Sequence, residues 1–167
     1  MNRLDIAING IKTAREYTEQ LLMKTNLDQW FCQPSEGVTH IAWQVGHLAF
    51  AEYAIALRRI RGARQNDVEL LPVVFHTLFG RMSVPRPEPA DYPNPAVIRE
   101  VFDRVHHQAI LELQDLRDLE LDDSTADPPH PMHKTKFGVL QWCSQHEFLH
   151  AGEIALLRRL LGEDALW

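Results

Sequence analysis

The placement of proline constrains the fold of this 167-residue chain more than any other feature of its sequence. The ten prolines occupy positions 34, 72, 85, 87, 89, 93, 95, 128, 129 and 131. Proline lacks an amide hydrogen and clashes with the preceding turn, so helix interiors avoid it. This distribution leaves four long segments in which helices can run, and it confines the loops to the stretches between them.

Apolar residues in these segments recur at steps of three and four, which is the period of an amphipathic helix. The pattern predicts helices at about residues 4–24, 40–62, 94–116 and 135–161. Asn94 followed by Pro95 favours a helix start, and Gly162 favours a helix end. The run at 69–79 is apolar, but Pro72 interrupts it, so a packed loop or a short helix is expected there.

These elements predict one domain over residues 1–167 that is all-α, a four-helix bundle with a long crossover between helices 2 and 3. No segment alternates with the period of a strand. The stretch at 84–95 is rich in proline and is expected to be a stiff connector, and 122–134 is expected to be a second loop. A chain of this length can bury a single core without further cross-links.

Composition argues against several classes of function. The formal net charge of −6 disfavours general nucleic-acid binding, which normally needs a basic face. No apolar run approaches the ~20 residues needed to span a bilayer, and the N-terminal residues lack the apolar core of a signal peptide. Cys32 and Cys143 are too few for a disulfide framework and suit a reducing compartment. We therefore expect a cytoplasmic protein with no nucleic-acid or membrane partner.

Three histidines fall on the core stripes of two predicted helices. His146 and His150 are four residues apart and share one helix face, and His47 lies on the stripe of the second helix. Buried imidazoles need a partner for each nitrogen, and a divalent metal ion can bind one nitrogen of each ring. The sequence therefore predicts a metal site formed by these three residues, with hydrogen-bonded core histidines as the competing interpretation. His40 and Cys143 are open alternatives for a further ligand.

The remaining histidines fall on loops or off the strongest apolar stripes and are interpreted as surface residues: His76, His106, His107, His130 and His133.

Residues 146–150 read HEFLH and match the H-E-x-x-H pattern of zinc proteases. The longer form of that motif needs Gly three positions and His six positions after the second His, where this chain has Glu153 and Leu156. The shorter form needs a Glu ligand on a following helix, and none is predicted. The third ligand that does exist, His47, lies upstream, so we interpret the match as a coincidence.

Three segments together resemble the DinB-like proteins, in the branch with a Trp-x-x-x-His-x-x-x-x-Glu segment. They are IAWQVGHLAFAEY at 41–53, LFGRMSVPRPEPADYP at 78–93 and HEFLHAGEIALLRRLLG at 146–162. The resemblance covers nearly the whole chain and implies a four-helix bundle, commonly a homodimer. It also implies a divalent metal ion, commonly nickel or zinc, held by three histidines that match His47, His146 and His150. The family usually has Gln where this chain has Glu153, which either orients His150 or faces solvent; we favour the first role.

The resemblance also bears on activity. Three neutral imidazoles leave a metal ion with an open coordination position, as in catalytic sites. Characterised DinB-like proteins transfer low-molecular-weight thiols onto electrophiles, which implies a small-molecule substrate. We therefore expect a metal-dependent thiol S-transferase or small-molecule hydrolase. Glu147 is the candidate catalytic base, or else an outer hydrogen-bond acceptor, and Glu52 is the other nearby acid; a solvated glutamate on the helix face is the competing interpretation for each. The alternative is a non-catalytic dimeric bundle with a structural metal ion or none.

Overall fold

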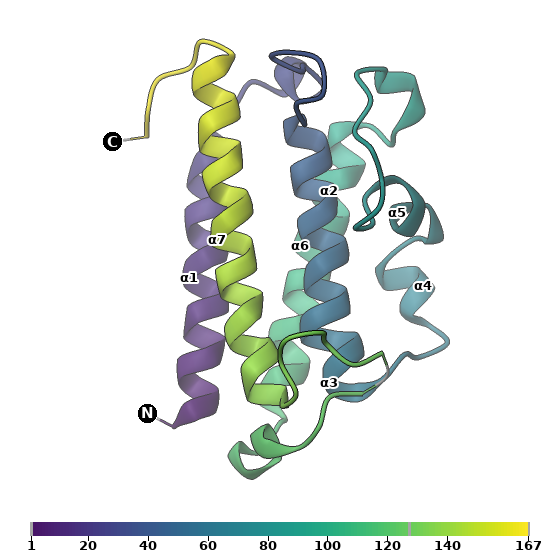
Figure 1. Cartoon of the computed structure of the whole chain (residues 1–167), viewed down its shortest axis with the longest axis vertical. Helices are drawn as coiled ribbons and strands as arrows, with labels where there is room; N and C mark the ends of the chain where they lie inside the picture. Colours follow the sequence, from purple (N-terminus) through teal and green to yellow (C-terminus); the bar gives the residue numbers. More distant parts are fainter. Residues whose placement is uncertain (1, 127, 167) are drawn as a thin grey trace.

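The computed structural model describes residues 2–126 and 128–166, which form helices and loops with one isolated β-bridge between Ser124 and Thr135. The prediction of an all-α fold is confirmed. The long helices are α1 (Arg3–Met23), α2 (Ile41–Glu52), α6 (Pro95–Gln114) and α7 (Lys136–Leu160), as labelled in Figure 1. The short ones are α3 (Arg59–Arg61), α4 (Asp67–Leu70) and α5 (Val73–Leu78), with 3-10 turns at Leu27–Gln29, Pro89–Asp91 and Asp118–Asp122.

Side-chain caps explain where the long helices begin. Asn2 accepts a hydrogen bond from the amide of Asp5 at the start of α1. Asn94 caps α6 immediately before Pro95, as predicted, and Thr135 caps α7. Each cap satisfies an amide that the first helical turn leaves without a partner, so the helix boundaries follow from local chemistry.

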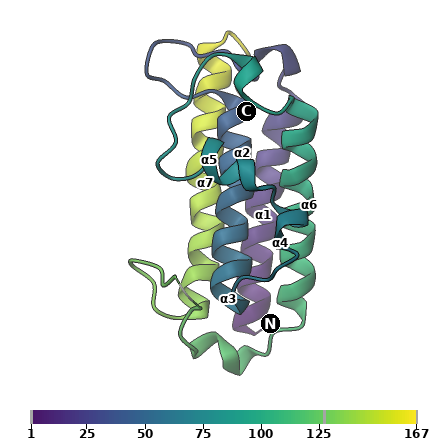
Figure 2. The same ribbon diagram turned by 90° about the vertical axis from the view of Figure 1, so that its right-hand side faces the viewer.

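Two of the long helices run in one direction and two in the other (Figures 1 and 2). Arg3, at the start of α1, binds Asp118 and Asp122 in the loop that leads to α7. Asn26, just after α1, donates its amide hydrogen to Glu163, just after α7. Helices α1 and α7 are therefore parallel and pack closely along their length, while α2 packs mainly on α6 and also meets α7. The contact between α2 and α7 brings the predicted histidines together.

The second long helix differs from its prediction. A continuous α-helix was expected to Gly62, but after Glu52 the helix widens into a π-helical segment, Tyr53–Arg58, before it closes again as α3. Such segments inside α-helices occur frequently at functional sites. The crossover that follows contains α4, which packs on α6, and α5, which packs on α2 (Figure 2). Helix α5 is the short helix expected as one possibility in the apolar run at 69–79.

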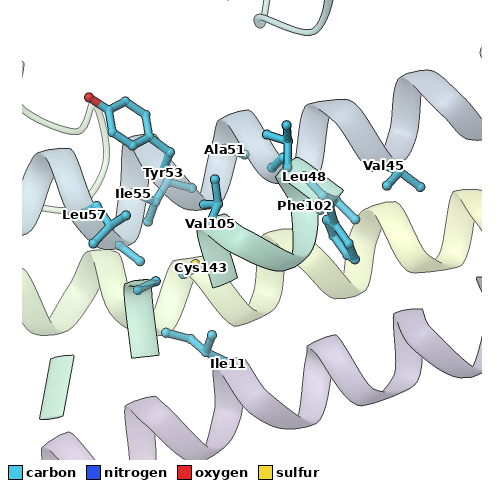
Figure 3. Close-up of a cluster of buried hydrophobic side chains, with 14 of the residues drawn as sticks. Ile11, Val45, Leu48, Ala51, Tyr53, Ile55, Leu57, Phe102, Val105 and Cys143 are labelled. Carbon is cyan, nitrogen blue, oxygen red and sulfur yellow. The ribbon is translucent and has the colours of Figure 1, made fainter. Parts of the chain in front are cut away.

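The core lies between the long helices, and Figure 3 shows part of it. Ile11, Leu48, Phe102 and Val105 come from three different helices, and each is almost completely buried. Burying one such side chain contributes about 1.5–3 kcal/mol, so this shared cluster fixes the helices relative to one another. Among the described residues, no helix combines the length and the apolar character that a membrane span requires.

Candidate metal centre

The structure brings the three predicted ligands together. His47 projects from α2, and His146 and His150 project from successive turns of α7. One possible ligand atom from each residue lies within 4.8 Å of those of the other two. The ring centroids are 4.5 Å apart for His146 and His150, and 4.7 Å apart for His47 and His150. A zinc–nitrogen bond is about 2.0–2.1 Å long, so the separations of these ligand atoms are of the size expected around one shared ion.

His47 is held by the end of the crossover. Its Nδ1 lies 2.7 Å from the carbonyl oxygen of Phe79. A carbonyl can only accept, so Nδ1 carries the hydrogen and Nε2 is left with a lone pair for a metal ion. The indole of Trp43 stacks on one face of the imidazole, at 4.7 Å between centroids and 7° between planes. His47 is therefore fixed in both tautomer and orientation.

His150 is held by a relay across α2 and α7. Its Nδ1 lies 2.5 Å from Oε1 of Gln44, and Nε2 of Gln44 donates to the carboxylate of Glu153. A carboxylate only accepts, so Glu153 sets which end of the buried amide faces His150. Glu153 thus contacts the ring-orienting group, which agrees with the role favoured from the sequence. The sequence interpretation missed Gln44, although it lies one helical turn before His47.

The environment keeps the three rings neutral. Burial, together with the smaller effect of the neighbouring imidazoles, lowers the pKa of His146 to about 4 and that of His150 to about 3. Burial also lowers the pKa of His47, against the opposing effect of its bond to the Phe79 carbonyl. A metal ion binds only the neutral imidazole. The donor set is therefore ready to bind at neutral pH, and it fits the ion that the sequence predicts.

Neither His40 nor Cys143, the two possible further ligands, joins the cluster of three histidines. Both ring nitrogens of His40 are in use, because Nδ1 accepts from the amide of Trp43 at 3.0 Å and Nε2 donates to the carbonyl of Arg86 at 3.1 Å. His40 is the N-cap of α2 and is completely buried. Cys143 is buried in the core, and burial raises the pKa of its thiol. It packs there as a small apolar residue.

A cavity of about 560 Å³ opens beside the histidines. His47 and His146 form part of its wall, so a ligand in the cavity would lie next to a bound ion. The wall also contains apolar side chains, two arginines and one further histidine: Phe50, Ile55, Met132, Trp142, Arg59, Arg81 and His130. The cavity has the mixed lining typical of sites for small molecules.

Three histidines interpreted as surface residues are not exposed, and that interpretation was wrong for them: His130, His106 and His133, of which His133 is half-buried against His130 and Trp142. His130 is 7% exposed, lines the cavity, and accepts backbone hydrogen bonds at Nδ1 from Met132 and His133. His106 is half-buried, and its Nδ1 lies 2.8 Å from a carboxylate oxygen of Glu52. His130 lies in a loop, where helical periodicity carries no information about burial.

Glu147 and Glu52 belong to a buried ionic cluster around Arg15. The guanidinium binds Glu147 Oε1 and Glu52 Oε2, each at 2.8 Å, and stacks on the Phe102 ring at 3.3 Å. Burial raises the pKa of Glu147. For Glu52 burial is outweighed by the charges of Arg15 and His106, which hold its pKa below the ordinary value. Glu147 is not among the residues that line the cavity, and its role as a catalytic base stays a prediction.

Comparison with known proteins agrees with this geometry. The family model of the DinB superfamily matches residues 11–154, a range that contains all three histidines. The chain therefore belongs to the DinB superfamily, and the resemblance seen in the sequence is confirmed. No curated protein matches the chain.

Proposed function

We propose that this DinB-superfamily chain is a four-helix bundle, with a long crossover between its second and third helices, that binds one divalent metal ion. His47, His146 and His150 would hold the ion, which we propose to be nickel or zinc because imidazole suits both. The convergence of three neutral rings from two helices is the observation that supports the proposal. The hydrogen bonds at Nδ1 of His47 and His150 support it further, since they leave Nε2 available.

We also propose that the ion serves a reaction of small molecules, either transfer of a low-molecular-weight thiol or hydrolysis. When bound, such an ion lowers the pKa of a coordinated thiol or water and so supplies a nucleophile near neutral pH. The cavity supports this proposal, because it places a binding space directly against His47 and His146. In that space Phe50 and Trp142 would exclude water from the reacting groups. As part of the same proposal, Glu147 acts as the catalytic base, and the protein is a homodimer in the cytoplasm.

The hydrogen bonds of His40 argue against the alternative function, a non-catalytic bundle with a structural metal ion. A structural metal site normally has four protein ligands, whereas a catalytic site keeps one position open. Both nitrogens of His40 are engaged elsewhere, and the cluster of possible ligands among the described residues contains three histidines. This favours the open site.

Metal analysis of untagged protein tests the proposal. Wild type, His47→Ala and His107→Ala would be incubated with equimolar nickel and zinc, dialysed and analysed by mass spectrometry. His107 is an exposed residue of α6 and serves as the control. We expect about one ion per chain in wild type and in His107→Ala, and a large loss in His47→Ala whose helical circular dichroism is unchanged. Equal metal in all three proteins would refute the three-histidine site.

A further inference from the structure

The cavity beside the histidines contains two arginines without acidic partners. Arg59 comes from α3, and Arg81 comes from the loop after α5. No carboxylate among the described residues forms an ion pair with either one. By contrast Arg61, two residues after Arg59, binds both Asp67 and Glu112. The two arginines at the cavity therefore differ from Arg61, whose charge is already offset by acidic partners.

Arg59 also has an unused donor. Its Nη1 donates to the carbonyl of Ala54 at 3.1 Å, but its Nε is buried and has no hydrogen-bond partner in the described part of the chain. Burial and the nearby charge of Arg58 lower the pKa of Arg59. A buried donor without a partner is unfavourable and uncommon in folded proteins. Arg59 lines the cavity, so an anionic ligand there would offset the charge of this partly buried guanidinium.

The rest of the wall restricts what the ligand can be. Phe50, Ile55, Met132 and Trp142 offer apolar surface, and none of the described residues that line the cavity is acidic. Two guanidinium groups concentrate positive charge there, although the whole chain carries a net charge of −6. Guanidinium groups match carboxylate and phosphate oxygens with paired hydrogen bonds. An apolar body with an oxyanion at one end fits this lining.

We propose that the cavity binds a small substrate whose apolar body packs on Phe50 and Trp142 and whose oxyanion, a carboxylate or a phosphate, binds Arg59 and Arg81. This proposal rests on the proposed function, because the reacting part of the substrate would then face His47 and His146. It adds the class of substrate: anionic rather than neutral.

Three probes with the same benzyl body test the charge preference: phenylacetate, benzyl phosphate and phenylacetamide. Their dissociation constants would be measured by ligand-observed NMR titration on zinc-loaded wild type, Arg81→Gln and Arg59→Gln/Arg81→Gln. Arg117→Gln is the control, since Arg117 is an exposed residue that pairs with Glu120 at 2.9 Å, and it does not line the cavity. Arg81 is exposed and has no ion pair among the described residues, so its single substitution is not expected to disturb the fold.

We expect at least one anionic probe to bind wild type and Arg117→Gln about tenfold more tightly than the amide, as one charge-assisted hydrogen bond would give. The tighter anion identifies the oxyanion. Arg81→Gln should reduce this preference, and the double variant should abolish it while amide binding stays unchanged.

An unchanged preference in the double variant, or no preference in wild type, would overturn the proposal. Zinc content measured on the same samples separates the two proposals. Lost anion preference with zinc retained assigns the effect to the arginines and not to direct coordination by the ion. Equal metal in wild type and His47→Ala would instead refute the metal site.

Discussion

Phe79 contacts α2 at His47 through its backbone and at the neighbouring Gly46 through its ring. The phenylalanine carbonyl accepts the Nδ1 hydrogen of His47 at 2.7 Å. Its ring lies against Gly46, the residue before His47, where a Cβ atom would come within 2.5 Å of the ring carbons. The end of the crossover is thus pressed onto α2 at the point where the helix carries a metal ligand. This contact needs a glycine at position 46.

The first prediction concerns Gly46→Ala. The added methyl group must displace the Phe79 ring, and with it the carbonyl that orients His47. We expect zinc affinity to fall by about 10–100-fold, the usual effect of losing an orienting partner of a ligand. Competition with a chromophoric chelator measures this. Gly152→Ala is the control: nothing lies within 4 Å of a Cβ there, so zinc affinity should not change. Wild-type affinity in Gly46→Ala would show that the contact does not orient the ligand.

The second prediction concerns the relay from His150 to Glu153. Gln44→Leu removes the acceptor for Nδ1 of His150, and we expect zinc affinity to fall by about tenfold or more. Glu153→Gln keeps an oxygen that can accept from Gln44, so it should change zinc affinity much less. The same chelator competition ranks the two variants. An equally large loss in Glu153→Gln would mean that the charge of Glu153, and not its contact with Gln44, supports His150.

Helix positions and the histidine cluster were predictable because both depend on short-range spacing. Proline exclusion and the three- and four-residue period located each long helical segment within a few residues, when α2, the π-helical segment and α3 are counted as one. The same period placed His146 and His150 on one face and turned His47 inward. The π-helical segment Tyr53–Arg58 was not predictable, because its residues fit an α-helical stripe and their widening depends on packing against α6 and α7.

The roles of the residues around the metal site could not be predicted, because they depend on tertiary contacts and not on sequence spacing. Arg81 and His130 reach the cavity from loops, where no period links sequence to direction. His40 could be identified as an inward-facing histidine, but its use as a helix cap depends on the carbonyl of Arg86 from the crossover. Glu147 lies next to a ligand in sequence, yet a one-residue step turns a side chain by about 100° on a helix. That step turns it toward Arg15 on α1.

The third prediction concerns Arg15. Arg15→Met leaves Glu52 and Glu147 buried without their cation, and we expect a loss of about 3–5 kcal/mol in the free energy of unfolding. Urea titration followed by circular dichroism measures it. Arg99→Gln is the control, because Arg99 is about one-third exposed and pairs with Glu19 and Asp103 nearer the surface. That variant should lose less than about 1 kcal/mol. A smaller loss for Arg15→Met than for Arg99→Gln would show that the buried cluster contributes little.

The last prediction concerns acid sensitivity through His40. Burial lowers the pKa of this ring to about 4 from its ordinary value of 6.5. The neutral ring is also the form that caps α2, because its Nδ1 accepts the amide hydrogen of Trp43. The unfolded chain therefore binds a proton on His40 between these pH values while the folded chain does not. The associated stability is fully present above pH 6.5 and is lost as pH falls to 4. The size of this loss is about 3 kcal/mol.

His40→Asn isolates this contribution. Asparagine can still accept at the helix start, since it is among the preferred N-cap residues, but it does not titrate. We expect the metal-free variant to lose less stability than metal-free wild type between pH 7 and 4, by about 3 kcal/mol. The other histidines titrate in both proteins, so their effect cancels in the difference. Urea titrations at about four pH values in this range give the two curves. Parallel curves would mean that His40 titrates alike in the folded and unfolded chains. Zinc content is a separate measurement: if the variant binds as much zinc as wild type, His40 is a helix cap and not a metal ligand.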